Sequence, residues 1–116
     1  MAEYSVTGFA PLGNSVAISA STTAPTAVQI PSNASPQTSG LQQFRLVNSG
    51  ANTVFLGVGA TASAALASAV VITSGQSSIA LLSGSVEILS FPMNSYFTGL
   101  TSTATSVVYI VPGQGL

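Results

Sequence analysis

The sequence contains no histidine, cysteine, tryptophan or lysine, and its only charged side chains are Glu3, Arg45 and Glu87. Enzymes take their general acids and bases, nucleophiles and metal ligands mainly from His, Cys, Lys, Asp and Glu. Because this chemistry is nearly absent, we expect no enzyme activity, no catalytic residue, no metal site and no cofactor. We expect the chain to act through its surface, by packing against another protein.

The shortage of cations excludes two further classes of partner. Binding to nucleic acid or to an anionic membrane surface needs several Lys or Arg side chains in one patch. The longest apolar run, residues 64–72, is far shorter than a membrane span and is interrupted by Ser68. Glu3 stands where a secretory signal peptide would carry Lys or Arg. The sequence therefore predicts no nucleic-acid partner, no membrane partner and no secretion by that route.

Without cysteine the chain has no disulfide, so its stability must come from packing and from partners. Only 3% of its residues are charged, whereas soluble domains carry about a quarter, and near-neutral surfaces tend to associate. Two interpretations remain open. The domain is made soluble by Ser, Thr, Asn and Gln alone, or, as we favour, much of its surface is covered inside an oligomer or larger assembly.

Short runs of alternating apolar and polar residues recur along the 116 residues, which is the pattern of half-buried strands. Segments rich in Gly, Pro and Asn separate them. Strand spacing of about ten residues predicts an all-β fold, an antiparallel β-sandwich or jelly roll of eight to nine short strands. Residues 1–14 are expected to form an N-terminal arm, residues 15–111 the sandwich and residues 112–116 a C-terminal tail. The predicted strands are 15–20, 27–30, 42–47, 53–58, 70–73, 78–82, 85–91, 96–100 and 106–111.

The strands at 42–47 and 53–58 are expected to form a hairpin, because Asn48-Ser49-Gly50-Ala51-Asn52 between them is a turn sequence. The strands at 96–100 and 106–111 are expected to be a second pair. Residues 60–69 are rich in Ala, but ten residues make a marginal isolated helix. A loop with at most one helical turn is therefore predicted there.

Two motifs could carry chemistry. Gly57-Val58-Gly59 is similar to part of a phosphate-binding loop, but the sixth position is Ala62, so a glycine-rich strand end is the better interpretation. Arg45 and Glu87 lie inside predicted strands and lack the partners that catalysis needs. A structural ion pair is expected instead, either across strands of one subunit or between subunits.

Aromatic residues in alternating strands are expected to lie mainly in the core. The tyrosines Tyr4, Tyr96 and Tyr109 are the exception, because a ring with a hydroxyl suits an interface that is apolar at one end and wet at the other. A sugar-stacking platform is disfavoured, since Trp and acidic side chains are absent or scarce.

Five segments follow one another in a distinctive order: GFAPLG at residues 8–13, VAISA at 16–20, FRLVNSGANTVFL at 44–56, GSVE at 84–87 and VYIVPGQGL at 108–116. Over nearly the whole chain, this order resembles that of the small decoration (cement) proteins of tailed bacteriophages. The chain departs from the resemblance at Gln114, where Glu is expected. If related proteins make a contact through a glutamate carboxylate at this position, that contact is not expected in this chain.

The resemblance implies a β-sandwich or jelly-roll protein on the outer surface of the virion capsid, made in the cytoplasm of the host bacterium. The implied partners are the major capsid protein and further copies of the chain, as a trimer or dimer. A protein that binds only the assembled shell stabilises it by mass action. Two alternatives remain open: a low-copy head-fibre or tail-associated β-module, and a glycan-binding module for host recognition.

We expect the interface to involve both ends of the chain and a few side chains of the strands. The arm and the tail are expected to be contact segments, whose deletion weakens binding without unfolding the sandwich. The candidate interface residues are Tyr4, Phe9, Leu12, Arg45, Glu87, Tyr96, Tyr109 and Leu116.

Overall fold

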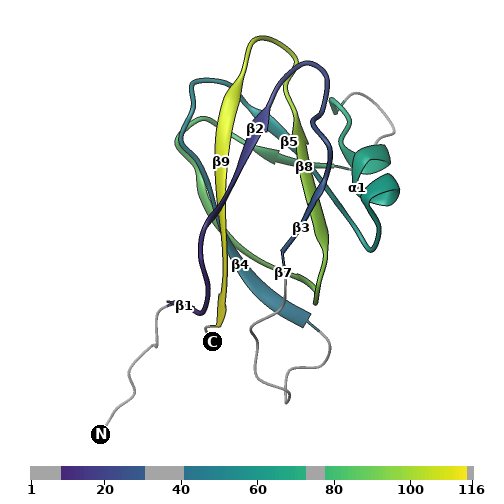
Figure 1. Cartoon of the computed structure of the whole chain (residues 1–116). Coiled ribbons are helices and arrows are strands. Elements are labelled where there is room, and N and C mark those ends of the chain that lie inside the picture. Colours follow the sequence, from purple (N-terminus) through teal and green to yellow (C-terminus); the bar gives the residue numbers. More distant parts are fainter. Residues whose placement is uncertain (1–8, 31–40, 73–77, 115–116) are drawn as a thin grey trace, which may run out of the picture.

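The computed structural model describes residues 9–30, 41–72 and 78–114. Within these ranges two antiparallel β-sheets face each other, and one short helix lies outside them (Figure 1). The predicted all-β sandwich is confirmed. The strands are β1 (Ala10–Pro11), β2 (Val16–Ala20), β3 (Val28–Gln29), β4 (Leu41–Asn48), β5 (Val54–Gly59), β6 (Ile79–Leu81), β7 (Val86–Pro92), β8 (Tyr96–Leu100) and β9 (Ser106–Gln114), and the helix is α1 (Ala62–Ser68).

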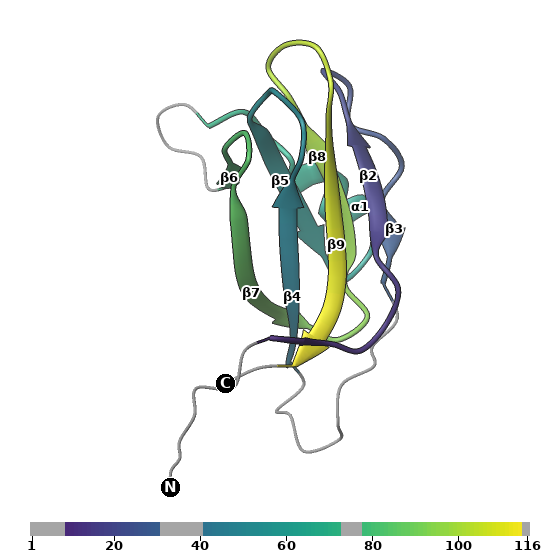
Figure 2. The same ribbon diagram turned by 90° about the vertical axis from the view of Figure 1, so that its left-hand side faces the viewer.

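The first sheet has the order β1-β9-β4-β7, and β2 also pairs with β9, on the same side as β1. The second sheet has the order β3-β8-β5-β6. Figure 2 shows the first sheet face-on, with the second sheet and α1 behind it. The face of the first sheet that points away from the second sheet is called the outer face below.

Both predicted hairpins are wrong. β4 pairs with β7 and β9 in the first sheet, whereas β5 pairs with β6 and β8 in the second. Likewise, β8 and β9 lie in different sheets. The links at residues 49–53 and 101–105 carry the chain from one sheet to the other. The alternating pattern did not reveal this, because apolar residues can face the core whether the two strands lie in one sheet or in two.

The prediction of a loop with at most one helical turn for residues 60–69 is also wrong, because α1 within this segment is a seven-residue helix. The Thr61 hydroxyl accepts a hydrogen bond from the backbone N–H of Ala64 at 3.1 Å and so caps its first turn. A strand was predicted for residues 70–73, but residues 70–72 are not in a strand. Thr73 lies outside the described residues.

The core lies between the two sheets and follows the predicted alternation. In β4, Phe44 and Leu46 are fully buried, while Arg45 between them is exposed. The Phe44 and Phe97 rings meet edge-on with centroids 4.9 Å apart, and the Phe91 ring lies 5.6 Å from that of Phe97. The buried hydrophobic cluster comprises Ile18, Ala20, Ile30, Phe44, Leu46, Val54, Leu56, Leu81, Phe97, Val108 and Ile110.

The first sheet extends at both ends beyond residues 15–111, the range predicted for the sandwich. β9 continues to Gln114, and Ala10–Pro11 pair with its last two residues. The Leu12 N–H donates to the Pro112 carbonyl at 2.9 Å, and the Phe9 ring lies against Gly113 so closely that a Cβ there would collide with it. Part of the predicted arm and part of the predicted tail therefore belong to the first sheet.

Candidate functional site

The outer face of the first sheet carries rows of mostly apolar side chains. Residues directly opposite one another in antiparallel strands point to the same face. Because Tyr109 is opposite both Ala17 and Val47, and Val47 is opposite Val86, these side chains form one row across β2, β9, β4 and β7. A second row is formed by Val111, Arg45 and Ile88.

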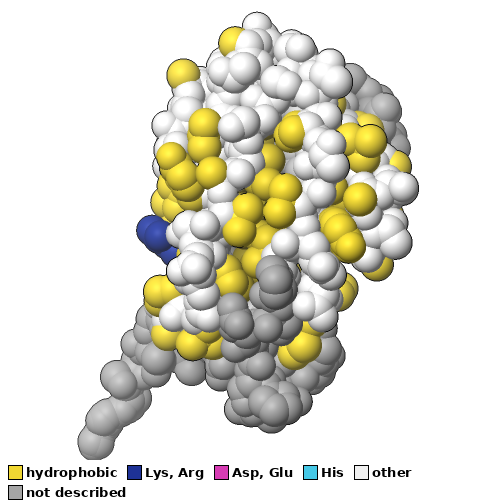
Figure 3. Space-filling view, in the orientation of Figure 1, with side chains coloured by type: hydrophobic (Ala, Val, Ile, Leu, Met, Phe, Trp, Pro, Cys, Tyr) yellow, Lys and Arg dark blue, Asp and Glu magenta, His cyan; other side chains and the backbone are white. Residues whose placement is uncertain are grey.

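Several of these apolar side chains are open to solvent. The relative exposure is 46% for Tyr109, 50% for Val86 and 48% for Ile88. Leu41, the first residue of β4, is exposed as well. Scattered apolar residues are ordinary on protein surfaces, whereas a continuous apolar face indicates a contact site. In Figure 3, hydrophobic side chains gather along the side formed by this sheet and in the seam between the two sheets.

Arg45 is the only cation of the chain, and it lies in the middle of the outer face. The predicted ion pair with Glu87 inside one subunit is wrong. Arg45 is opposite Ile88, whereas Glu87 is opposite the buried Leu46, so the two charges belong to opposite faces of the sheet. Both side chains are exposed. The alternative pair between subunits stays a prediction.

The structure brings three of the predicted interface residues onto one face. Phe9, Arg45 and Tyr109 all lie on the outer face of the first sheet, since Phe9 packs on Gly113 there. Leu12 is exposed near the same end of β9. Tyr96, in contrast, lies in β8 of the second sheet. Tyr4 and Leu116 lie outside the described residues.

A buried polar cluster joins the turns at the end of the sandwich where β4 ends. Asn48 is fully buried, and its side-chain N–H groups donate to the carbonyls of Asn52 and Leu81, both at 2.8 Å. Its Oδ1 accepts from the Ser106 hydroxyl at 2.7 Å and from the Gly50 N–H at 3.1 Å. The cluster ties both sheets together. The sequence indicates a turn at residues 48–52, but it does not show that Asn48 joins the two sheets, because that depends on strands far apart in the sequence.

Gly57 and Gly59 lie at the end of β5, as the strand-end interpretation predicted, and the structure shows in addition that both have a packing role. A Cβ on Gly57 would collide with the Ala65 carbonyl oxygen and lie 2.7 Å from the Ala69 Cβ. A Cβ on Gly59 would lie 2.7 Å from the Ala64 Cβ. The absence of side chains on this part of β5 therefore lets α1 lie directly on the second sheet.

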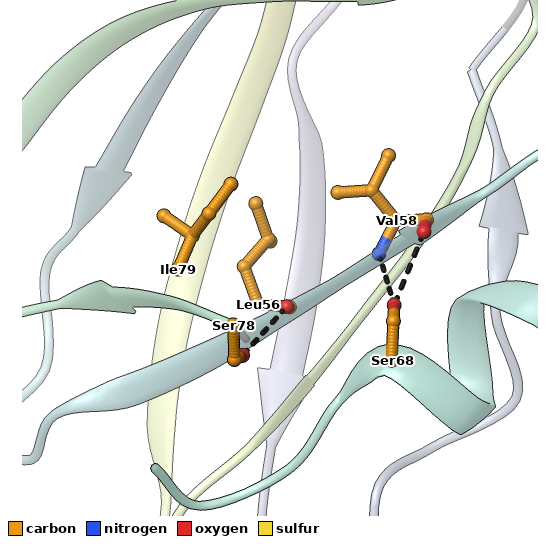
Figure 4. Close-up of a pocket in the computed structure, with 5 residues that line it drawn as sticks. All are labelled: Leu56, Val58, Ser68, Ser78 and Ile79. Atoms are coloured by element: carbon orange, nitrogen blue, oxygen red, sulfur yellow. Dashed lines mark hydrogen bonds between the residues drawn. The ribbon is translucent and has the colours of Figure 1, made fainter. Parts of the chain in front are cut away.

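A pocket of about 180 Å³ lies between β5, β6 and α1 and is lined by Leu56, Val58, Ser68, Ser78 and Ile79 (Figure 4). The Ser68 hydroxyl accepts from the Val58 N–H at 2.9 Å and donates to the Val58 carbonyl at 3.1 Å. The Ser78 hydroxyl donates to the Leu56 carbonyl at 3.3 Å. Both hydroxyls are therefore engaged with the backbone of β5, and the lining contains no titratable side chain.

Among the described residues, no group of three or more His, Cys, Asp or Glu side chains could hold a metal ion. No helix in the same part of the chain is long and apolar enough to cross a membrane. Comparison with protein-family models, curated proteins and solved structures gave no match to this chain. The outer face of the first sheet is therefore the candidate site on which a function can be argued.

Proposed function

We propose that this chain is a structural virion protein without enzyme activity, which binds the outer surface of a phage capsid and stabilises the assembled shell. The observation that carries the proposal is the outer face of the first sheet. It is a broad, mostly apolar surface on a domain with almost no charge. Contact with another protein removes such a surface from water, at about 25 cal/mol per Å² of apolar area.

The order of sequence motifs supports the choice of a capsid as the partner, because it resembles that of phage decoration proteins. The single Arg and the absence of Lys suit a position outside the shell, away from packaged DNA. A protein that binds the assembled shell, and not its separate subunits, stabilises the shell by mass action. The major capsid protein is the proposed partner.

Counting the chain in particles tests the proposal first. Particles purified from the lysate in which the chain is made are analysed by quantitative mass spectrometry against the major capsid protein. We expect copy numbers of the same order for the two proteins. A handful of copies would instead indicate a head-fibre or tail-associated module, and complete absence from particles would contradict the virion role and leave glycan binding to be tested.

A substitution on the outer face tests the surface itself. Tyr109→Lys places a cation in the middle of the apolar row, and we expect it to weaken binding to capsids about tenfold or more, since buried aromatic anchors dominate interfaces. The matched control is Leu66→Lys, because Leu66 is equally exposed but lies on α1 behind the second sheet. Occupancy is measured by cosedimentation with capsids that lack the protein. Equal occupancy of the two variants would exclude this face.

A further inference from the structure

β7 forms the longest edge strand of the sandwich. Among the described residues it pairs with β4 alone, and it is seven residues long. The strands at the other edges, β1, β2, β3 and β6, have two, five, two and three residues. Figure 2 shows β7 at the margin of the first sheet.

The hydrogen bonds at the start of β7 show which of its backbone groups are free to bind. The Asn48 N–H donates to the Ser85 carbonyl at 3.1 Å and its C=O accepts from the Gly84 N–H at 2.8 Å, so the backbone groups of Asn48 point toward the β7 side. Because the direction alternates along a strand, those of residues 42, 44 and 46 do so as well, and the backbone groups of residues 87, 89 and 91 opposite them point toward β4. The N–H and C=O groups of Val86, Ile88 and Ser90 therefore point away from the sheet.

This edge lacks the usual protection against pairing. Natural edge strands are blocked by Lys, by an internal Pro, by a bulge or by several charges. β7 has one charge, Glu87, and its only proline, Pro92, is its last residue. Val86 and Ile88 are about half exposed. A strand of this kind is a template for another strand.

We propose that β7 pairs in antiparallel fashion with β7 of a second copy, so that the first sheets of the two copies become one continuous sheet. The strand is complementary to itself, because each copy offers outward N–H and C=O groups at the same alternate positions. A two-fold pairing also closes the assembly, since it leaves neither β7 edge free. With so few charges of either sign, the chain shows no charge pattern that would select a different partner strand.

Symmetry restricts the register. Opposite residues must point to the same face, so the residue nearest the two-fold axis must lie opposite the same residue of the other copy, and not opposite its chain neighbour. An axis at Glu87 would place two carboxylates opposite each other, which is unfavourable. An axis at Ile88 or Leu89 keeps the carboxylates apart and pairs most of the strand.

The pairing places the outer faces of both copies on the same side of the joined sheet. If the outer face binds the capsid as proposed above, each dimer then binds it through two equivalent surfaces, which raises the apparent affinity. The pairing itself does not depend on that function. Its test in solution is therefore separate from the capsid experiments.

The first experiment measures the mass of the whole chain by sedimentation equilibrium. We expect twice the chain mass of 11.5 kDa. Ser90→Pro removes an outward N–H and no hydrogen bond to β4, and we expect it to weaken dimerisation by about tenfold or more. Ser90→Ala keeps the N–H and is expected to dimerise like the unsubstituted chain. Circular dichroism and urea unfolding check that Ser90→Pro is folded.

The second experiment uses the absence of cysteine from the sequence. The introduced thiol of Ile88→Cys lies opposite its copy when the two-fold axis is at Ile88. The same holds for Leu89→Cys when the axis is at Leu89. We expect one of these variants to form a reducible dimer under mild oxidation. Leu66→Cys on α1 is the control and is expected to stay unlinked.

Three results would overturn the proposal. The first is a monomer or a trimer in solution, because a two-fold edge pairing gives a dimer. The second is a dimer that Ser90→Pro leaves intact. The third is cross-linking of Leu66→Cys as efficient as that of both β7 variants.

Discussion

At the scale of single residues, Asn48 shows how one polar side chain can hold a sandwich together. It occupies a position of β4 that faces the core, where apolar residues precede it at Leu46 and Phe44. All of its side-chain hydrogen-bonding groups have protein partners, which lie in the link 49–53, at the end of β6 and at the start of β9. Burial of a polar group is tolerated only under that condition.

Replacing Asn48 with Ala should therefore leave the Leu81 and Asn52 carbonyls, the Ser106 hydroxyl and the Gly50 N–H without this partner. We expect Asn48→Ala to lower the free energy of unfolding by about 2–4 kcal/mol, measured by urea unfolding followed by circular dichroism. The control is Asn14→Ala, since Asn14 is exposed and its loss should change stability by less than about 0.5 kcal/mol. Similar losses in the two variants would contradict the role of the buried cluster.

Single-residue burial was predictable where it depends on alternation along one strand. The alternation Phe44-Arg45-Leu46 predicts that Phe44 and Leu46 share one face of the strand and that Arg45 lies on the other, and in the structure Phe44 and Leu46 are buried and Arg45 is exposed. That Arg45 and Glu87 lie on opposite faces and do not pair within one subunit was not predictable, because it depends on the register between β4 and β7. A shift of one residue in that register would reverse the face to which Glu87 points.

At the scale of elements, α1 depends on the strand beneath it. A helix of seven residues is too short to be stable alone. Its stability comes from packing on Gly57 and Gly59 of β5 and from the Ser68 hydroxyl, which bonds the Val58 backbone. The sequence does not show this relation, because helix propensity is a local property, whereas the contact of α1 with the two glycines exists only in the folded chain.

Gly57→Ala tests this dependence. The added methyl group would meet the Ala65 carbonyl oxygen and the Ala69 side chain, so α1 must move away from β5. We expect a loss of about 1–3 kcal/mol in the free energy of unfolding, as for other overpacked sites. Ser63→Ala on the exposed side of α1 is the control and should be nearly neutral. An unchanged stability of Gly57→Ala would show that the helix does not need close contact with the strand.

At the scale of the whole molecule, the near absence of charge sets how the protein responds to its solution. With one cation and two anions in 116 residues, electrostatic interactions contribute little to its stability. The fold class could be predicted because each strand carries its own period-2 pattern and its own turn signals. The assignment of strands to sheets could not, because turns such as 49–53 have the composition of a hairpin while they join two sheets.

Stability is therefore expected to be nearly independent of ionic strength. Between about 0.01 M and about 0.15 M sodium chloride, the screening length falls from about 30 Å to about 8 Å. Over this range we expect the free energy of unfolding to change by less than about 0.5 kcal/mol, measured by urea unfolding. Sodium sulfate is the positive control, because its exclusion from the protein surface strengthens apolar burial. A strong dependence on sodium chloride would reveal ionic contacts that the described residues do not show.

The position of β9 also affects how the chain folds during synthesis. β9 lies between β4 on one side and β1 and β2 on the other, so it separates strands that the ribosome makes much earlier (Figure 2). Until residues 106–114 have emerged, β4 can pair with β7, but no strand joins this pair to β2. The first sheet is therefore completed only after translation has passed residue 114, through pairings between distant parts of the chain, which form slowly. Until β9 has been made, the parts of the first sheet that it joins are therefore open to chaperones and proteases.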